Sequence, residues 1–379
     1  MPEFQDADFL FFFGAGASAP FGIPTMKQFV IDFEREMGIR GPNTSDSAVA
    51  LSNTYTAIKN ALETKLGVGH VDLEAIFSVI DGIINYSPDR LGLLALYLLT
   101  KSREPSELDI QVCKLLREKF QSFVRAKCLI PEEENKRDHI SRVYHDFFNR
   151  LLLEFSGGRD VRDGHYWSDR WAMFTTNYDT CLEYYWRQVT SIGIDTGFDS
   201  NPRVARTILN AKKLLSEGSE LQLFKLHGSV NWLIEAGTGL IMETEMETAR
   251  SHYGRRIQGE AMIYPIAEKE LYLDPYISML LRLNRELENK RVWVVIGYSF
   301  NDPIIREIFQ RKSRAEKKLI LVHPEATKVR EGRLTPIRSE IEMVEKRFGE
   351  EGTFRQVDHQ IIHKLKENPK YSWQETPLK

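Results

Sequence analysis

Five short apolar segments constrain the fold of this chain more than any other feature of its sequence. Apolar side chains run through each segment without alternating with polar ones, which is typical of strands buried on both faces of a parallel sheet. A turn and a helical pattern follow each of the first four segments, and the fifth ends at Pro324. Strands that alternate with helices predict an α/β fold, in which ligands bind where strands end and helices begin. The segments are residues 9–13, 171–175, 223–226, 292–297 and 319–323.

A long run of helical patterns separates the first predicted strand from the second, with no strand-like segment inside it. We therefore predict a Rossmann-type core formed by residues 1–39 and 166–379, and a helical insertion subdomain formed by residues 40–165. A later polar segment, residues 194–218, is expected to be part helix and part loop. The helices predicted between the first two strands are residues 49–65, 73–85, 91–99, 108–127 and 139–155.

Charge and cysteine content exclude several classes of protein. The 51 lysines and arginines are balanced by 54 aspartates and glutamates, whereas a dedicated duplex-DNA binder is usually strongly basic. Direct nucleic-acid binding is therefore not expected. None of the three cysteines stands in a Cys-x-x-Cys pair, which predicts a reducing compartment and no zinc ribbon.

The sequence also lacks the pattern of a membrane or secreted protein. Its longest apolar run, residues 91–99, has about half of the ~20 residues that a helix needs to cross a bilayer. Near the N-terminus, Glu3, Asp6 and Asp8 stand where a signal peptide carries basic residues. We therefore expect a cytoplasmic protein with no membrane association.

A glycine-rich loop follows the first predicted strand and reads Gly14-Ala-Gly-Ala-Ser-Ala19. Glycines in such a turn let the backbone approach a pyrophosphate closely, with amide N–H groups aimed at it. Tight strand–helix turns also use glycine for purely structural reasons. The strand before the loop and the helix that Thr25 can cap after it favour dinucleotide binding. A dehydrogenase would also need an acidic residue after a second strand, and no such strand follows here.

Polar residues also follow the other predicted strands. The second strand leads into Thr175-Thr-Asn-Tyr-Asp179, the third ends at His227-Gly228, and the fourth leads into Gly297-Tyr-Ser299. Each has a structural alternative, since Asp179 can cap the next helix and a lone histidine at a strand end is more often structural than catalytic. Asp302-Pro303 predicts a helix that begins with proline at its first position.

Taken together, these segments resemble the sirtuins, and more closely the sirtuin-like domains of bacterial defence systems. Sirtuins carry G-A-G-x-S with G-I-P downstream, then T-Q-N-x-D, a catalytic H-G, and G-T-S at a strand end. The order and rough positions agree over residues 8–325. The resemblance implies an α/β fold with a sirtuin-like Rossmann core, a parallel sheet and a large helical insertion. The matching segments are Gly14-Ala-Gly-Ala-Ser18, Gly22-Ile-Pro24, Thr175-Thr-Asn-Tyr-Asp179, His227-Gly228 and Gly297-Tyr-Ser299.

The departures from the sirtuin pattern narrow the implied activity. Sirtuin deacetylases carry a zinc ribbon of two Cys-x-x-Cys pairs after the catalytic histidine, and this chain has no cysteine beyond Cys181. Thr176 replaces the glutamine of T-Q-N-x-D, and Met26-Lys27 replaces an aromatic residue and an arginine. Without the ribbon that helps to form the acyl-lysine channel, the resemblance implies an NAD⁺ glycohydrolase. Its substrate would be NAD⁺, its products nicotinamide and ADP-ribose, and it would need no metal.

The resemblance also implies a role for each matching residue. Asp179 would bind the nicotinamide carboxamide, and Asn177 would contact the ribose and orient the attacking water. His227 would act as general base, a role that the ordinary pKa of histidine suits. The residues implied to bind the rest of NAD⁺ are Gly14, Ala15, Gly16, Ser18, Pro24, Thr25, Thr176, Gly297 and Ser299.

The family context implies an effector that depletes NAD⁺ in antiphage defence. No sensor domain is visible in the sequence, so we expect a homo-oligomer whose assembly controls the active site, with a HerA-like ATPase as a candidate partner. Two alternatives stay open: a protein deacylase or ADP-ribosyltransferase of sirtuin type, and a non-catalytic sensor of NAD or ADP-ribose. The presence of both Asn177 and His227 favours the enzyme.

Overall fold

The structure is a computed structural model that divides into two compact units. The core unit comprises Met1–Gly22, Ile130–Ala261 and Leu273–Lys379, and the helical unit comprises Ile23–Leu129 and Met262–Tyr272. Within these ranges no described helix is both long enough and apolar enough to span a lipid bilayer. The described residues are 9–36, 46–69, 71–84, 110–130, 133–155, 171–190, 193–201, 206–216, 221–244, 257–262, 274–350, 355–357 and 359–360.

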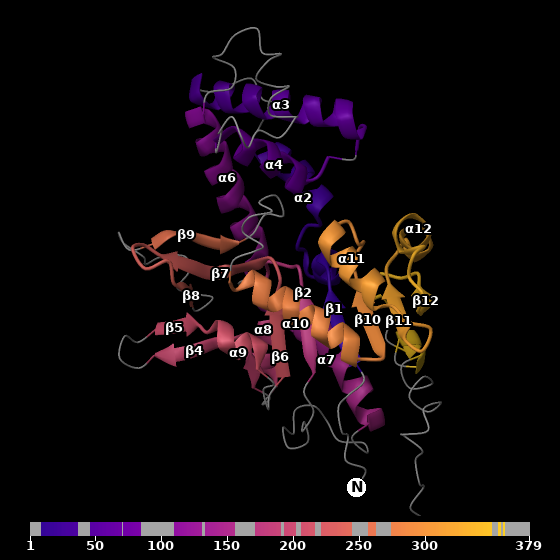
Figure 1. The fold of residues 1–379 in the computed structure, drawn as a ribbon. Helices are drawn as coiled ribbons and strands as arrows, with labels where there is room; N and C mark the ends of the chain where they lie inside the picture. The colour runs from indigo at the N-terminus through magenta and orange to yellow at the C-terminus, as the bar shows by residue number, and fades with distance from the viewer. Residues whose placement is uncertain are drawn as a thin grey trace, which may run out of the picture. The chain divides into compact units, whose positions relative to one another are not determined.

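A seven-stranded sheet forms the centre of the core unit (Figure 1). All its neighbouring strands are parallel, in the order β12-β11-β10-β1-β2-β6-β3. The predicted α/β fold with a parallel sheet is confirmed, and each of the five apolar segments contributes one strand. The strands are β1 (Phe9–Phe13), β2 (Ala172–Thr175), β3 (Ile194–Asp195), β6 (Leu221–Lys225), β10 (Val292–Ile296), β11 (Lys318–Val322) and β12 (Glu340–Val344).

Strand β1 is buried along its whole length because helices cover both faces of the sheet. Phe11 packs edge-on against Phe147 and Phe148 of α7 (Glu134–Phe155). Phe12 points to the opposite face, since side chains alternate along a strand, and packs against Phe309 of α11 (Pro303–Lys312). A strand between two helical layers has no face for polar residues, which explains the continuous apolar run.

Most of the remaining elements of the core unit connect or cover the strands of this sheet. They are α1 (Ala15–Ser18), η1 (Ala19–Phe21), α8 (Cys181–Tyr184), the π-helix η4 (Tyr185–Val189), α10 (Tyr276–Asn289), α12 (Ala326–Val329) and the π-helix η7 (Arg330–Leu334). Helix α11 begins at Pro303 with Asp302 as its N-cap, so the predicted helix start is confirmed.

The strand order places the point where the connections reverse direction beside β1. From β1 the chain runs to β2 on one side and later returns to the other side as β10. In open α/β sheets, ligands bind at such a reversal, outside the carboxyl ends of the strands. The glycine loop follows β1, Asn177 follows β2, His227 follows β6 and Gly297 follows β10, so these residues all lie at this one edge.

A second sheet corrects the expectation for residues 194–218. This segment was expected to be part helix and part loop, but its described residues contain β3, β4 and β5 besides the short helix α9. The five-stranded sheet has the order β4-β5-β8-β7-β9. Its elements are β4 (Phe198–Asn201), β5 (Arg206–Leu209), α9 (Ala211–Leu215), β7 (Gly228–Glu235), β8 (Ile241–Glu243) and β9 (Ile257–Met262).

The sequence does not predict the strands of the second sheet, because most of these strands are short and polar. Their stability comes from antiparallel pairing and from contacts between residues distant in the chain. Phe198 of β4, for example, packs edge-on against Trp232 of β7 at 5.1 Å between ring centres. A contact of this kind leaves no local pattern in the sequence.

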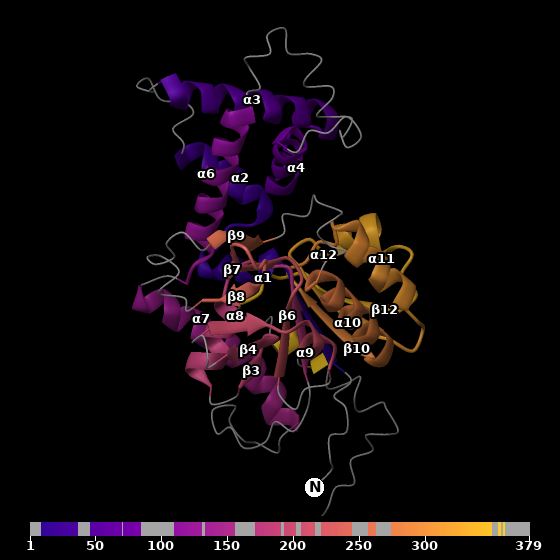
Figure 2. The ribbon, with the colours of Figure 1, turned by 60° about the vertical axis from the view of Figure 1, so that its left-hand side comes forward.

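The helical unit contains four described helices, which agree with predicted ones and lie together in Figure 2. Its core is aromatic: Phe33 stacks on Phe120 at 3.5 Å between ring centres, and Tyr55 packs against both. The predicted helix at residues 91–99 lies outside the described residues. The helices are α2 (Met26–Glu36), α3 (Asp46–Leu66), α4 (Leu73–Ile84) and α6 (Ile110–Cys128).

Helix α7 belongs to the core unit, although the sequence groups it with the helices of the insertion. Its aromatic residues provide the reason, since Phe147 and Phe148 contact Phe11 of the central strand. The first segment of the helical unit therefore ends at Leu129, while the predicted insertion extends to residue 165. The predicted boundaries at residues 40 and 165 stay a prediction.

The loops after β1 and β10 pack backbone against backbone, which requires glycine in both. A Cβ on Gly14 would lie 2.7 Å from the Gly297 carbonyl oxygen, and one on Gly16 would lie 2.8 Å from the Gly297 Cα. Gly297 itself has a φ of +65°, and a Cβ there would overlap Ala17 N and the Gly16 carbonyl carbon. The hydrogen bond from Gly16 N–H to the Gly297 carbonyl, 2.9 Å, closes this contact.

We expect Gly297→Ala to destabilise the core unit strongly. The left-handed backbone costs an alanine about 1–2 kcal/mol, and the overlap with the Gly14–Ala17 loop adds about 1–3 kcal/mol. Gly237→Ala is the matched control, because Gly237 has a φ of +87° but open space around its Cβ position. Urea unfolding should give a loss of about 1–2 kcal/mol for the control and clearly more for Gly297→Ala. Equal losses would contradict a close backbone contact at Gly297.

Candidate active site

Thr175, the last residue of β2, ties the end of this strand to the end of β1. Its hydroxyl donates to the Phe13 carbonyl at 3.1 Å and accepts the Asn177 N–H at 3.0 Å. The Thr176 N–H donates to the same carbonyl at 3.2 Å. The backbone that carries Asn177 is therefore fixed against the end of the central strand.

The Asn177 side chain is buried against the glycine loop. Its amide nitrogen donates to the Gly14 carbonyl and to the Ser18 hydroxyl, both at 2.9 Å. These two bonds use both amide hydrogens. The amide oxygen is buried and has no hydrogen-bond partner in the described part of the chain. It is therefore free to accept a hydrogen bond from a ligand or a water.

The glycine loop uses several of its own N–H groups to build the fold. Gly14 N–H donates to the Ile296 carbonyl, Gly16 N–H to the Gly297 carbonyl, and Ala17 N–H to the Gly14 carbonyl, at 2.8–2.9 Å. The glycines thus have a structural function at the contact between β1 and β10. The assignment of Gly14, Ala15, Gly16 and Ser18 to the pyrophosphate stays a prediction.

His227 lies where the two sheets join. Strand β6 of the parallel sheet ends at Lys225, and β7 of the second sheet begins at Gly228, whose φ of +78° allows the turn. Thr175 pairs with Lys225 in the register of β2 and β6, so Asn177 and His227 each lie two residues beyond the same register position. The imidazole is 4% exposed, and its Nδ1 has no hydrogen-bond partner among the described residues.

Asp302 is a site residue that the sequence did not reveal as such. Its Oδ2 lies 3.4 Å from Nε2 of His227, while its Oδ1 accepts the N–H groups of Ile304 and Ile305 at the start of α11. Burial raises the pKa of Asp302, but the hydrogen bond and charge of His227 and the two backbone N–H groups outweigh it, so the pKa lies below its usual value. The signal available in the sequence was the helix start, and nothing local connects it to His227.

Asp179 makes a local contact with the start of α8, whose N-cap is the next residue, Thr180. Its Oδ1 accepts the Cys181 N–H at 3.0 Å, at the first residue of α8, and the side chain is buried. Its assignment to the nicotinamide carboxamide stays a prediction. Burial, together with the charge of Asp179, raises the pKa of the Cys181 thiol far above its usual value, so this thiol stays protonated.

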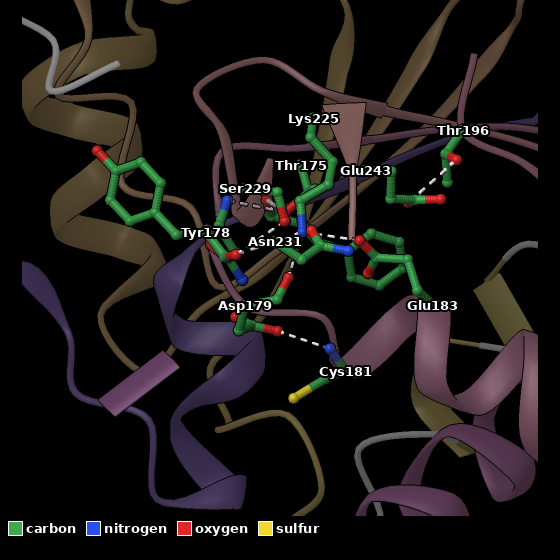
Figure 3. A network of polar contacts seen from close by, with 12 residues as sticks. Thr175, Tyr178, Asp179, Cys181, Glu183, Thr196, Lys225, Ser229, Asn231 and Glu243 are labelled. Carbon is green, nitrogen blue, oxygen red and sulfur yellow. Dashed lines mark hydrogen bonds and ion pairs between the residues drawn. The ribbon is translucent and has the colours of Figure 1, made fainter. Parts of the chain in front are cut away.

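A buried ion pair supports the segment that carries Asn177 and Asp179 (Figure 3). The Lys225 ammonium lies 2.8 Å from Oε1 of Glu183, and the two side chains are 0% and 1% exposed. The same ammonium donates to the Tyr178 and Asp179 carbonyls. Ser229 also donates to the Tyr178 carbonyl, through its hydroxyl at 3.2 Å. Strands β6 and β7 thus hold the backbone of residues 178 and 179.

A second ion pair lies beside the first and joins η4 to the antiparallel sheet. Arg187 donates to both carboxylate oxygens of Glu243, at 3.0 and 3.1 Å, and to the Thr196 hydroxyl. Figure 3 shows Glu243 and Thr196 next to the group around Lys225. Burial raises the pKa of Glu243, and the charge and hydrogen bonds of Arg187 lower it in part.

Of the remaining predicted site residues, the structure places only some near Asn177 and the glycine loop. Ser299 follows β10, and its carbonyl accepts a hydrogen bond from Arg333 at 3.0 Å. Tyr144 of α7, which sequence reasoning missed, is buried and shares a hydrogen bond with Ser18; burial raises the pKa of its phenol far above the usual value. Pro24 and Thr25 belong to the helical unit, so their place at the site stays a prediction.

A cavity of about 340 Å³ lies in the core unit away from these residues. It is lined by Arg311, Arg314 and Arg338 among others, near the amino ends of β11 and β12. Arg311 pairs with Glu307, and Arg314 donates to the carbonyls of residues 311 and 313. The side chains of Arg311 and Arg314 are therefore engaged with the protein. In the described ranges, no three His, Cys, Asp or Glu residues gather as a metal site would require.

Comparison with known protein families gives a match over one part of the chain. Residues 172–341 match the family of SIR2-like domains. The matched segment is less than half of the chain, and it includes Asn177, Asp179, His227 and Asp302 but neither β1 nor the glycine loop. No curated protein is similar enough in sequence to count as a relative.

Solved structures of Sir2 proteins give weak likenesses over most of the chain. A structure of Sir2 enzymes described for their mechanism and regulation is 14% identical, with a TM-score of 0.40, covering 94% of this chain and 92% of that one. A Sir2 homologue bound to NAD is 16% identical, with a TM-score of 0.40 and coverages of 94% and 89%. A mutant Sir2 homologue bound to ADP-ribose is 15% identical, with a TM-score of 0.42 and coverages of 95% and 94%. Scores this low carry no weight for this chain.

We expect Lys225→Met to destabilise the protein by about 3–5 kcal/mol, because it leaves the Glu183 carboxylate buried without its partner. Replacing both residues, Lys225→Met with Glu183→Leu, should recover part of this loss, since it also removes the unpaired charge. Lys328→Met is the matched control, because Lys328 pairs with Glu325 on the surface, where water screens the two charges and the ion pair contributes little to stability. Urea unfolding measures all three variants. A Lys225→Met chain as stable as the control would contradict the structural role of this pair.

Proposed function

We propose that this protein is an NAD⁺ glycohydrolase, which cleaves NAD⁺ to nicotinamide and ADP-ribose. The observation that carries the proposal is a pair of buried polar atoms, Oδ1 of Asn177 and Nδ1 of His227, that have no hydrogen-bond partner among the described residues. They belong to residues at the carboxyl ends of adjacent parallel strands, inside the segment that matches SIR2-like domains. Buried polar atoms in native proteins are almost always paired, and these two lie at neighbouring strand ends, where one bound substrate or water can pair with them.

The proposed reaction breaks the bond between C1′ of the ribose and the nicotinamide nitrogen. The bonding electrons leave with nicotinamide, which becomes neutral, and positive charge develops on the ribose as in glycoside hydrolysis. A water oxygen forms the new bond to C1′. One of its protons remains on the new hydroxyl group, and the other passes to a base and then to solvent.

Each of the two buried atoms has a task in this reaction. The Asn177 oxygen is a hydrogen-bond acceptor, and its amide nitrogen is already held by Gly14 and Ser18, so it can orient the attacking water or a ribose hydroxyl. His227 offers a ring nitrogen to take the proton. Asp302 beside it carries a negative charge, which stabilises the imidazolium that forms. NAD⁺ is the substrate, and no step requires a metal.

The pattern of cysteines favours water over an acyl-lysine as the acceptor of the ADP-ribosyl group. The zinc ribbon of the deacetylases needs two Cys-x-x-Cys pairs, and this chain has Cys113, Cys128 and Cys181, all buried and none in such a pair. A deacylase or ADP-ribosyltransferase of sirtuin type would turn over only with its acceptor. A non-catalytic sensor would bind NAD⁺ and leave it intact.

We further propose a cytoplasmic effector that depletes NAD⁺ in antiphage defence, controlled by assembly with itself and with a HerA-like ATPase. An enzyme that destroys NAD⁺ would harm its own cell unless it had an inactive state. Apolar side chains on the surface of the helical unit, Ile31, Leu66 and Val68, support an interface there.

Incubation of the purified protein with NAD⁺ alone should release nicotinamide and ADP-ribose in equal amounts, as chromatography of the products can measure. Asn177→Ala and His227→Ala should each lower turnover by about 10²-fold or more, the usual effect of removing a positioned base or charge stabiliser. EDTA should leave the rate unchanged. Binding of NAD⁺, followed by calorimetry, should be largely kept in both variants.

Three results would contradict the proposed function. Turnover that depends on an acyl-peptide would indicate the deacylase, and tight binding without turnover would indicate the sensor. Wild-type turnover in His227→Ala would make this histidine structural. Glu307→Ala is a suitable control for handling and folding, because Glu307 lies on the surface and pairs only with another exposed side chain in the described contacts.

Light scattering combined with the NAD⁺ assay tests the control by assembly. We expect an oligomer whose specific activity rises with protein concentration, or when the candidate ATPase is added. A partner that binds the active arrangement more tightly by about 3 kcal/mol would shift the population about a hundredfold. A monomer whose full specific activity is independent of concentration and partner would contradict this part of the proposal.

A further inference from the structure

We propose that Asp302 positions His227 by holding the ring proton on Nε2, so that Nδ1 is the nitrogen that accepts a proton from the substrate or water. This inference rests on the proposed function, because it assigns the reacting atom of the proposed general base. Asp302 is then a positioning residue, since it acts through the imidazole.

The contact between the two side chains fixes which ring nitrogen carries the proton. A neutral imidazole has one N–H donor and one acceptor nitrogen, and a carboxylate can only accept. Nε2 lies 3.4 Å from Oδ2 of Asp302, and both side chains are largely buried. The favourable arrangement puts the proton on Nε2, facing the carboxylate. The lone pair is then on Nδ1, the atom without a partner among the described residues.

The carboxylate of Asp302 is itself fixed, because its two oxygens have different partners. Oδ1 accepts the N–H groups of Ile304 and Ile305, at 2.8 and 3.2 Å, and so caps α11. This leaves Oδ2 for His227. Helix α11 is anchored in turn by Ile305 and Phe309, which are buried in the core. The cap therefore sets the direction from which His227 is held.

The loop before Asp302 is also held in place. Phe300 has a φ of +57°, an uncommon conformation for a residue other than glycine, and its carbonyl accepts a hydrogen bond from Arg306 at 3.2 Å. The preceding carbonyl, that of Ser299, is bonded to Arg333. Phe300 is thus held by Arg306 and its neighbour Ser299 by Arg333, and a strained backbone held in this way indicates that the position of the segment matters.

Asp302→Asn is the decisive variant, because it separates the two functions of the carboxylate. Asparagine caps helices as well as aspartate does, so α11 keeps its start. With its oxygen on the cap, the amide presents N–H groups to Nε2, and the ring proton must move to Nδ1. We expect turnover of NAD⁺ to fall by about 10²–10⁴-fold with little change in KM, as when a base is held in the wrong tautomer.

A second readout follows the tautomer directly. In protein labelled with ¹⁵N in its histidine rings, the His227 signals should report a proton on Nε2 in the wild type and on Nδ1 in Asp302→Asn. The His227→Ala variant assigns these signals. In the His227→Ala background, Asp302→Asn should cause no further loss of turnover, because the residue it positions is gone.

Asp302→Ser provides the matched control for the helix cap. Serine also caps helices but is too short to reach the imidazole, so this variant should fold and lose turnover without fixing the opposite tautomer. If Asp302→Asn fails to fold, Asp302→Ser carries the same test through its turnover and its ring signals.

The outcomes separate this inference from the proposed function. Wild-type protein that leaves NAD⁺ intact overturns the proposed function, and the tautomers then decide the inference alone. Full turnover in Asp302→Asn or in Asp302→Ser, or a proton on Nδ1 in the wild type, overturns the inference and leaves Asp302 as a helix cap only. A loss of turnover in Asp302→Asn together with the exchanged tautomer supports it.

Discussion

The backbone contact between Gly16 and Gly297 is the constraint on which the candidate site depends. Strand β1 lies between β2 and β10, and its loop can turn across the sheet only because two loops approach without side chains between them. This close approach brings the Gly14 carbonyl and the Ser18 hydroxyl within reach of Asn177. The glycines that resemble a phosphate-binding loop therefore also have a packing function, which is the reason that close strand–helix contacts need glycine.

The buried charges of Lys225 and Glu183 hold the backbone of the candidate site in place, and their burial lowers the stability of the protein. Lys225 and Glu183 lose their hydration when they are buried, and this costs free energy. The attraction between the two charges offsets that cost only when their geometry is good. An apolar pair of similar size could fill the same space, but it could not bind the Tyr178 and Asp179 carbonyls as the Lys225 ammonium does. The segment between Asn177 and Asp179 thus has a fixed position, and the buried charges fix it.

The polar atoms at the site that have no described partner also lower the stability of the protein. Oδ1 of Asn177 and Nδ1 of His227 are buried without a hydrogen-bond partner in the described ranges, and an unmade bond costs about 1–3 kcal/mol for each atom. A substrate or a water that bonds to these atoms recovers that free energy. Proteins commonly accept such local costs where function needs a prepared polar surface, and satisfy polar groups elsewhere.

The sequence by itself determined the parallel sheet and which strand ends carry polar residues. Continuous apolar runs such as Phe9–Phe13 leave a clear local pattern, and Asp302-Pro303 marks a helix start. Only the tertiary structure decided that Asp302 faces His227, that Lys225 pairs with Glu183, and that β3 and β4 form as strands. The physical reason is that apolar periodicity and capping act between neighbours in the chain. A buried charge pair or a short polar strand is stabilised by residues that only folding brings together.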